Sequence, residues 1–225
     1  SRYLQFPPQG FSLQWYEQFF HGRNWMAATL RSFQVALLTA LLATLMGTMA
    51  SLALVRGAFP GKRLLYGLII SPLIVPVIIA AVAVYYVFAF FRMVGTIWVL
   101  VLAHTALALP FVVVNVTATL QGFDVTLERA ALSLGANRLV TFLRVILPLT
   151  WPGIFSGALF AFITSFDEVV VAIFLAGAKP TLPKQMWDGI RVAINPTISA
   201  AASLLITFSV VLLLTLQVFS RRKRG

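Results

Sequence analysis

The chain has 225 residues, of which 60% are hydrophobic and only 10% are charged, and its formal net charge is +11. A soluble domain carries about 25% charged residues, so this composition indicates an integral membrane protein. The absence of cysteine excludes a disulfide scaffold and a thiolate metal site. No basic face with interleaved aromatic residues accompanies the positive charge, so we expect no nucleic acid partner.

Five apolar segments are each long enough to cross a bilayer, which takes about 20 residues in an α-helix. No alternation of polar and apolar residues indicates the strands of a membrane barrel. We therefore expect an all-α fold, a polytopic helical membrane protein with about five transmembrane helices that contact the lipid bilayer. The predicted spans cover residues 32–55, 65–91, 96–119, 149–176 and 196–219.

The positions of Lys and Arg indicate how the spans are oriented, because cytoplasmic loops are enriched in these residues. If the C-terminus lies inside, ten of the 17 cationic residues fall on the cytoplasmic side. We therefore expect a transmembrane domain at residues 31–220, followed by a basic cytoplasmic tail at residues 221–225. An odd number of spans then places residues 1–30 outside, as a lead-in with an interfacial helix around residues 15–20.

The segment from Gly57 to Arg63 superficially resembles a nucleotide-binding P-loop but lacks its chemistry. Three residues separate Gly57 from Gly61, where the motif has four, and Arg63 replaces the Ser or Thr that binds magnesium. The chain also has only two histidines and no cluster of catalytic residues. We therefore expect that the chain is not an enzyme and that it carries no cofactor or metal.

A short amphipathic helix is predicted in the loop between the third and fourth spans. Asp124 can cap its start, and Gly135 is the residue expected just beyond its end. A second helix is predicted to follow this glycine and to lead into the membrane. One face of the first helix repeats at i, i+3, i+4 and i+7 and contains Leu127, Ala130, Ala131 and Leu134. The two alanines allow close approach of another protein, so we interpret the helix as a docking surface.

This loop, at about residues 122–146, resembles the cytoplasmic EAA loop of the permease subunits of bacterial ABC importers. The family pattern is E-A-A, three residues, Gly, nine residues, Ile, one residue and Leu-Pro. Arg129 stands where the family has Glu, and Glu128 lies one residue earlier. The remaining register is held by Ala130, Ala131, Gly135, Val145 at the isoleucine position, Leu147 and Pro148.

The resemblance implies a membrane subunit that forms half of a translocation pathway, together with a second homologous permease subunit. ATP and magnesium would bind to a separate cytoplasmic ATPase dimer, and a periplasmic or external binding protein would deliver the solute. The complex would lie in the bacterial cytoplasmic (inner) membrane. The ATPase would contact the coupling helix through Asp124, Leu127, Glu128, Arg129, Ala130, Ala131, Leu134 and Gly135. Because such subunits usually have six helices, we also expect one further helix before residue 1.

Two adjacent carboxylates, Asp167 and Glu168, lie within the predicted fourth span. A carboxylate inside a bilayer costs about 2.5–3.5 kcal/mol on insertion scales, so such residues tend to face water or a cation. Neighbouring positions on a helix cannot point the same way, so at most one of the pair faces a pathway. The alternative is a structural role, in an ion pair or in capping a helix at a break.

The surroundings of this acidic pair resemble the spermidine/putrescine branch of the permease family. The segments concerned are Phe166–Val171, Leu182–Pro183 and Asn195–Pro196. The resemblance implies a small cationic solute, a polyamine, which a carboxylate in the path would attract. Candidate pathway residues are Asp167, Glu168, Phe166 and Tyr85, of which Tyr85 can make cation–π contacts with an amine.

Two other functions remain open at this stage. A permease of the same family can import another small nitrogenous solute, such as an opine or aminobutyrate. A protein of another class, an ion-coupled secondary transporter, would instead use Asp167 or Glu168 to carry the coupling proton. The secondary transporter does not explain the amphipathic helix that ends at Gly135.

Overall fold

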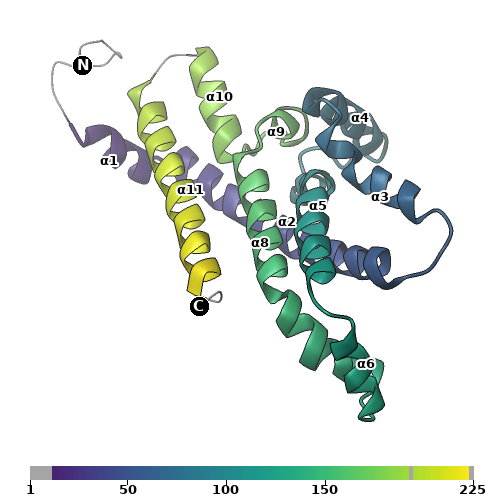
Figure 1. Ribbon diagram of the computed structural model, residues 1–225. Coiled ribbons are helices and arrows are strands. Elements are labelled where there is room, and N and C mark those ends of the chain that lie inside the picture. Colours follow the sequence, from purple (N-terminus) through teal and green to yellow (C-terminus); the bar gives the residue numbers. More distant parts are fainter. Residues whose placement is uncertain (1–11, 193–194, 223–225) are drawn as a thin grey trace. The chain divides into compact units, whose positions relative to one another are not determined.

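The computed structural model describes residues 12–192 and 195–222, and all regular structure within these residues is helical (Figure 1). The predicted all-α membrane fold is therefore confirmed. The beginning of the predicted lead-in, residues 1–11, and the end of the predicted basic tail, residues 223–225, lie outside the described residues. The helices are α1 Gln14–His21, α2 Arg23–Arg56, α3 Lys62–Ile70, η1 Ser71–Leu73, α4 Val77–Phe90, α5 Ile97–Gly122, α6 Thr126–Ser133, α7 Arg138–Thr141, η2 Phe142–Ile146, α8 Leu147–Asp167, α9 Val170–Leu175, α10 Leu182–Val192 and α11 Pro196–Arg222.

Three helical stretches among the described residues are long and apolar enough to cross a membrane. They are Arg23–Arg56, Ile97–Gly122 and Arg138–Asp167, and they correspond to the first, third and fourth predicted spans. The second predicted span is a pair of helices, and the fifth lies within α11, of which Pro196–Leu212 is a shorter apolar stretch. Each of the five predicted segments is therefore helical, although they differ in length and continuity.

The second predicted span, residues 65–91, is not one continuous helix, and that part of the prediction is wrong. The chain leaves the helical path after Leu73 and resumes it at Val77. Pro72 and Pro76 explain the break, because proline has no N–H to donate and disfavours the helical conformation in the residue before it.

The fourth predicted span, residues 149–176, is also interrupted, because α8 ends at Asp167 and the short helix α9 begins at Val170. At its other end, α8 continues from a π turn, in which Leu147 donates its N–H to the carbonyl oxygen of Phe142. This turn comes directly before Pro148, which has no N–H of its own. The helical path therefore runs unbroken from Arg138 to Asp167.

By contact density the chain forms two compact units. Unit 1 comprises Ser1–Ala36, Val77–Ala103 and Phe166–Gly225, and unit 2 comprises Leu37–Pro76 and His104–Ser165. We describe the two units separately.

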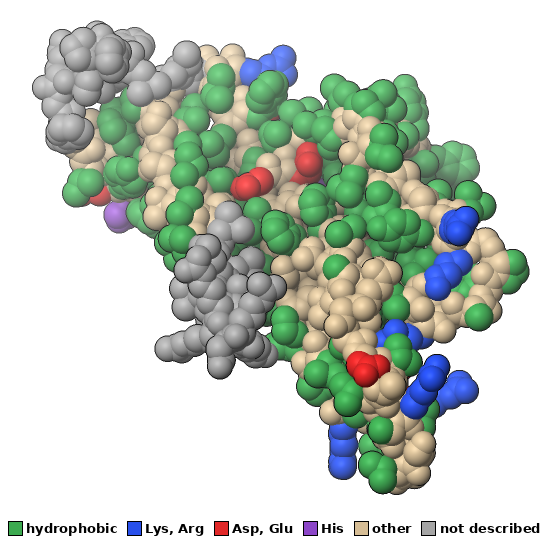
Figure 2. Space-filling view, in the orientation of Figure 1, with side chains coloured by type: hydrophobic (Ala, Val, Ile, Leu, Met, Phe, Trp, Pro, Cys, Tyr) green, Lys and Arg blue, Asp and Glu red, His purple; other side chains and the backbone are tan. Residues whose placement is uncertain are grey.

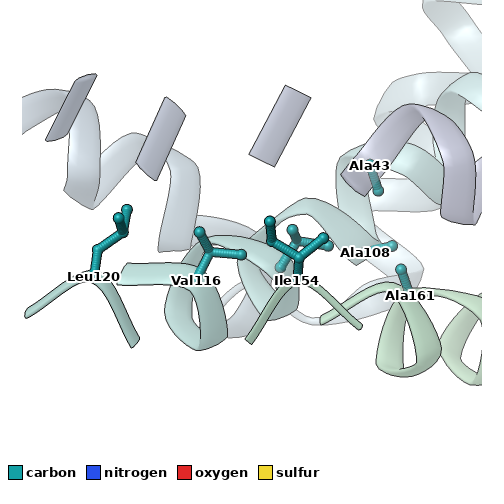
Figure 3. Packing of buried hydrophobic residues seen from close by; sticks show 7 residues of the cluster. Ala43, Ala108, Val116, Leu120, Ile154 and Ala161 are labelled. Atoms are coloured by element: carbon teal, nitrogen blue, oxygen red, sulfur yellow. The ribbon is translucent and has the colours of Figure 1, made fainter. Parts of the chain in front are cut away.

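The core of unit 2 is a cluster of small and branched apolar side chains (Figure 3). Its buried members are Ala43, Ala108, Val112, Val116, Leu120, Ile154 and Ala161. Glycines allow the helices to pack closely around this cluster, since a Cβ on Gly157 would lie 2.9 Å from Val112 Cα and one on Gly153 would overlap Thr119 Oγ1. The GxxxG spacing of these glycines therefore serves the packing of α8 on α5.

In unit 1 the short helix α1 packs against α11 and includes residues 15–20, for which a helix was predicted; its place at the membrane interface stays a prediction. Phe19 is buried beside Leu182 and Ala201. Tyr16 and Ser203 share a hydrogen bond of 2.9 Å between their hydroxyl groups, and the Thr197 hydroxyl donates to Gln18 Oε1 at 2.8 Å. These contacts anchor the helix that precedes α2 to the last helix of the chain.

Candidate coupling and transport sites

The predicted docking helix is present as α6, and its two ends are built as the sequence predicted. Asp124 Oδ1 accepts a hydrogen bond of 2.9 Å from the backbone N–H of Thr126. Hydrogen bonds from Thr126 lower the pKa of the Asp124 carboxyl, which keeps it ionised as a helix cap. At the other end Gly135 has a φ of +87°, a left-handed conformation that favours glycine.

The apolar face of α6 is uncovered in this chain. Leu127 is 47% exposed and Leu134 is 89% exposed, and Ala130 is exposed between them. Ala131 is half-buried. Several Lys and Arg side chains gather around α6, whereas hydrophobic side chains cover much of the remaining visible face (Figure 2). An exposed apolar patch with a charged rim is typical of a protein interaction site.

Glu128, in contrast, forms an ion pair with another residue of this chain. Its Oε1 forms an ion pair with Arg56, the last residue of α2, at 2.6 Å from Nη2 and 2.8 Å from Nε. Both side chains are largely buried, with 24% of Arg56 and 15% of Glu128 exposed. The Arg56 guanidinium also lies 4.9 Å from the ring centre of Phe123. This ion pair fixes α6 to the end of α2, whereas the neighbouring Arg129 is exposed.

Sequence reasoning missed this contact, since the Lys and Arg residues of the loops were used there only as a group, to predict the orientation of the spans. It also missed Asn137, whose Oδ1 accepts a hydrogen bond of 2.9 Å from the N–H of Val140 and caps α7. An asparagine directly before an apolar helical stripe is a signal from which this cap could have been predicted. The predicted pair of helices separated by a glycine is otherwise confirmed.

The acidic pair lies at the break between α8 and α9, and the prediction that it lies within a continuous helix is wrong. Glu168 Oε1 accepts hydrogen bonds from the N–H groups of Val170 and Val171, at 2.8 and 3.1 Å. These are the first N–H groups of α9, which have no partner within the helix. Glu168 therefore has the capping role that the sequence analysis weighed as an alternative. Asp167 is the last residue of α8 and is exposed.

Phe166 and Tyr85, the two aromatic candidates, lie in different surroundings. Phe166 is only 3% exposed, and its ring centre lies 4.9 Å from that of Phe33 and 5.3 Å from that of Phe208. It is thus a core residue of unit 1 that holds the end of α8. Tyr85 is half-buried on α4, and its ring centre lies 6.5 Å from that of Phe174 on α9. Only Tyr85 of the two keeps an accessible ring surface near α9.

No group of three or more His, Cys, Asp or Glu side chains that could hold a metal ion occurs within residues 12–192 and 195–222. The buried His104 is instead hydrogen-bonded through Nδ1 to Ser165 Oγ at 2.8 Å. This contact joins α5 to α8 within unit 2. A buried histidine that is hydrogen-bonded between two helices of the core is typical of a structural role.

Comparisons with known proteins agree with this arrangement of helices. The sequence pattern of the family described as "Binding-protein-dependent transport system inner membrane component" matches residues 41–225. The spermidine/putrescine transport system permease protein PotC of Haemophilus influenzae is 34% identical over 218 residues, covering 95% of this chain and 84% of that protein. The putrescine transport system permease protein PotI of Escherichia coli is 34% identical over 208 residues, covering 88% of this chain and 73% of that protein.

A solved structure of a bacterial ABC transporter, involved in the import of the acidic polysaccharide alginate, shares the fold with a TM-score of 0.77. It is 14% identical in sequence, and the match covers 96% of this chain and 86% of that chain. The family pattern and the relatives agree on one family, and the solved structure agrees in fold. The chain therefore belongs to the family of binding-protein-dependent transport system inner membrane components, as a permease subunit of an ABC importer.

Proposed function

We propose that this permease imports a small cationic solute, namely a polyamine such as spermidine or putrescine. The observation that carries this proposal is the similarity to PotC and PotI, which are 34% identical to this chain over most of its length. Membership of the family favours an ATP-driven importer over an ion-coupled secondary transporter. Within the family, import of an opine or of aminobutyrate is the alternative that an experiment must separate from polyamine import.

Asp167 is the carboxylate that we assign to the solute pathway. Glu168 uses Oε1 to cap α9, whereas Asp167 is exposed at the end of α8. In the complex, a second homologous permease subunit would complete the pathway and enclose this carboxylate. A carboxylate out of bulk water attracts an ammonium group strongly, which suits the passage of a polyamine. Tyr85 can add a cation–π contact, and Phe166 supports the end of α8 from the core.

The coupling site that we propose is the apolar face of α6, formed by Leu127, Ala130, Ala131 and Leu134. An ATPase dimer that binds ATP and magnesium would dock there on the cytoplasmic side, where the C-terminus also lies. Because Glu128 is tied to Arg56, a push on α6 would be transmitted directly to the end of α2. The exposed Arg129 stands at the position where the family pattern has glutamate, and we expect it to contact the ATPase.

The proposed substrate is tested by uptake of labelled spermidine and putrescine into cells that carry the whole transport system. We expect uptake that depends on this permease and that unlabelled polyamines suppress, whereas an excess of unlabelled aminobutyrate does not. Suppression by aminobutyrate or an opine, with no polyamine uptake, would contradict the polyamine assignment. Deletion of the permease is the control for other uptake routes.

A further inference from the structure

Unit 1 contains a positively charged pocket that the coupling and pathway residues do not explain. The pocket has a volume of about 330 Å³ and lies between the first part of α2, the segment that joins α9 to α10, and the first turn of α10. Its polar lining consists of Arg31 and Lys179, which are cationic, and of the amides of Asn24 and Gln185. None of the residues that line it is acidic.

The walls of this pocket are held by contacts within unit 1. The N–H of Leu182 donates a hydrogen bond of 2.8 Å to Ser32 Oγ, and both residues are buried. The N–H of Gly95 donates to the carbonyl oxygen of Leu175 at 2.9 Å. Gly177 approaches so closely that a Cβ there would lie 3.0 Å from Gly95 Cα. The segment that carries Lys179 is thus fixed to α2 and to the start of α5, and the pocket is preformed.

Only part of the hydrogen-bonding capacity of the Arg31 guanidinium is used within this pocket. Its Nη2 donates a hydrogen bond of 3.2 Å to the carbonyl oxygen of Gly95. Its Nε is buried and has no hydrogen-bond partner among the described residues. A buried donor without a partner is uncommon in folded proteins, so this N–H is available to a hydrogen-bond acceptor that enters the pocket. A guanidinium group suits a carboxylate in particular, because its donors can bind both carboxylate oxygens.

We propose that this pocket receives a carboxylate side chain of the substrate-binding protein, with Arg31 and Lys179 as its counter-charges. This inference rests on the proposed function for the orientation of the chain. The family is binding-protein-dependent, so the complex requires a surface that recognises this partner. A cationic solute would be repelled by the pocket, so the pocket is distinct from the solute pathway around Asp167.

The position of the pocket along α2 supports this partner. Arg31 lies in the first part of α2, and Arg56, which holds the coupling helix, is its last residue. Arg31 and Arg56 are 25 residues apart (56 − 31) in the same helix, a rise of about 38 Å, which exceeds the hydrocarbon thickness of a bilayer of about 30 Å. The two arginines therefore belong to opposite sides of the membrane if the helix spans it. The end with Arg56 faces the ATPase, and the end with Arg31 faces the binding protein.

The test uses the complete transport complex reconstituted in nanodiscs of phosphatidylcholine, with its binding protein added at increasing concentration. The readout is the binding-protein concentration that half-saturates stimulated ATP hydrolysis. We expect Lys179→Glu to raise this concentration about tenfold at low ionic strength, because it replaces an attraction by a repulsion. The difference should shrink as salt is added, because salt screens charges that are accessible to solvent.

Two further variants make the result specific. Arg31→Gln removes the buried charge and should raise the half-saturating concentration as well, and it is measured separately because its Nη2 contact also supports the fold. Arg191→Glu makes the same charge change as Lys179→Glu at an exposed residue of α10 outside the pocket lining, and it should stay within about twofold of the wild type.

Three outcomes would overturn the inference. If both pocket variants respond like Arg191→Glu while the wild type is stimulated normally, the pocket does not receive the binding protein and the proposed function stands. If Lys179→Glu alters ATP hydrolysis without binding protein, and only in nanodiscs with phosphatidylglycerol, the pocket holds a lipid headgroup. If binding protein with polyamine does not stimulate even the wild type, both the proposed function and this inference are contradicted.

Discussion

The coupling segment and the break between α8 and α9 use adjacent residues in the same way. At α6, Glu128 is paired with Arg56 inside the chain, and its neighbour Arg129 is exposed. At the break, Glu168 caps α9, and its neighbour Asp167 is exposed. In each region one charged side chain holds the chain together and the adjacent one remains available to a partner or a solute. The charged residues that remain free to contact a partner or a solute are therefore those that make no contact of this kind within the fold.

The largest effect is expected where the partner surface itself is blocked. Ala130→Trp places a bulky ring on the exposed face of α6, and we expect the ATPase subunit to be lost on purification of the complex. Co-purification of the two subunits at equal permease expression measures this effect. Ala58→Trp, at an exposed alanine before α3, is the matched control. Retention of the ATPase by Ala130→Trp would show that α6 is not the docking surface.

The second prediction concerns the ion pair between Arg56 and Glu128, which joins the coupling helix to the end of α2. Arg56→Glu or Glu128→Arg alone should reduce uptake per ATP hydrolysed, because each leaves two like charges facing each other. The double variant reverses the pair and should recover most of the loss, with a coupling energy of about 1–2 kcal/mol. Uptake and ATP hydrolysis are measured in proteoliposomes for all four proteins. Additive losses in the double variant would contradict a direct role of the ion pair.

The third prediction distinguishes Glu168 from Asp167 by the effect of each substitution on the stability of the fold. Glu168→Ala removes the cap of α9 and should destabilise the fold by about 1 kcal/mol. For a chain of this size, that corresponds to a fall in Tm of about 2–4 °C. Asp167→Ala should leave the Tm in detergent unchanged, because this side chain caps no helix. Equal destabilisation by the two variants would contradict the division of roles between them.

The smallest effect concerns the start of α6. Asp124→Ala removes the acceptor for the N–H of Thr126, so hydrogen exchange in the first turn of α6 should become faster. Asp124→Asn keeps a side-chain oxygen at the same place and is the matched control. Exchange measured by mass spectrometry on the peptide that contains Thr126 reports the difference. Unchanged exchange in the alanine variant would mean that this cap does not stabilise the helix.

Much of this arrangement was predictable because it depends on local sequence signals. Hydrophobic length predicted the helical segments, and the spacing of Leu127, Ala130, Ala131 and Leu134 predicted α6. Gly135 predicted where that helix ends. The break near Pro76 also had a local signal, since proline interrupts the hydrogen bonds of a helix. The sequence analysis nevertheless placed one continuous span across residues 65–91.

Other features could not be predicted, because they depend on contacts between distant residues or on the choice of one side chain. Arg56 and Glu128 are 72 positions apart in the sequence, and no periodicity links them. No proline or glycine marks the break after Asp167 in the sequence. The chain leaves α8 there, and the Glu168 carboxylate caps the start of α9. The closed walls of the Arg31 pocket likewise depend on the approach of Gly95 to Gly177.

The most direct test of the account compares initial rates of labelled spermidine uptake by Asp167→Asn and Glu168→Gln at equal membrane expression. We predict that Asp167→Asn reduces uptake about tenfold or more, which corresponds to the loss of one charge-assisted contact. Glu168→Gln keeps an oxygen that can cap α9, so it should retain most of the uptake. Normal uptake by Asp167→Asn, or a larger loss in Glu168→Gln, would contradict the assignment of Asp167 to the solute pathway.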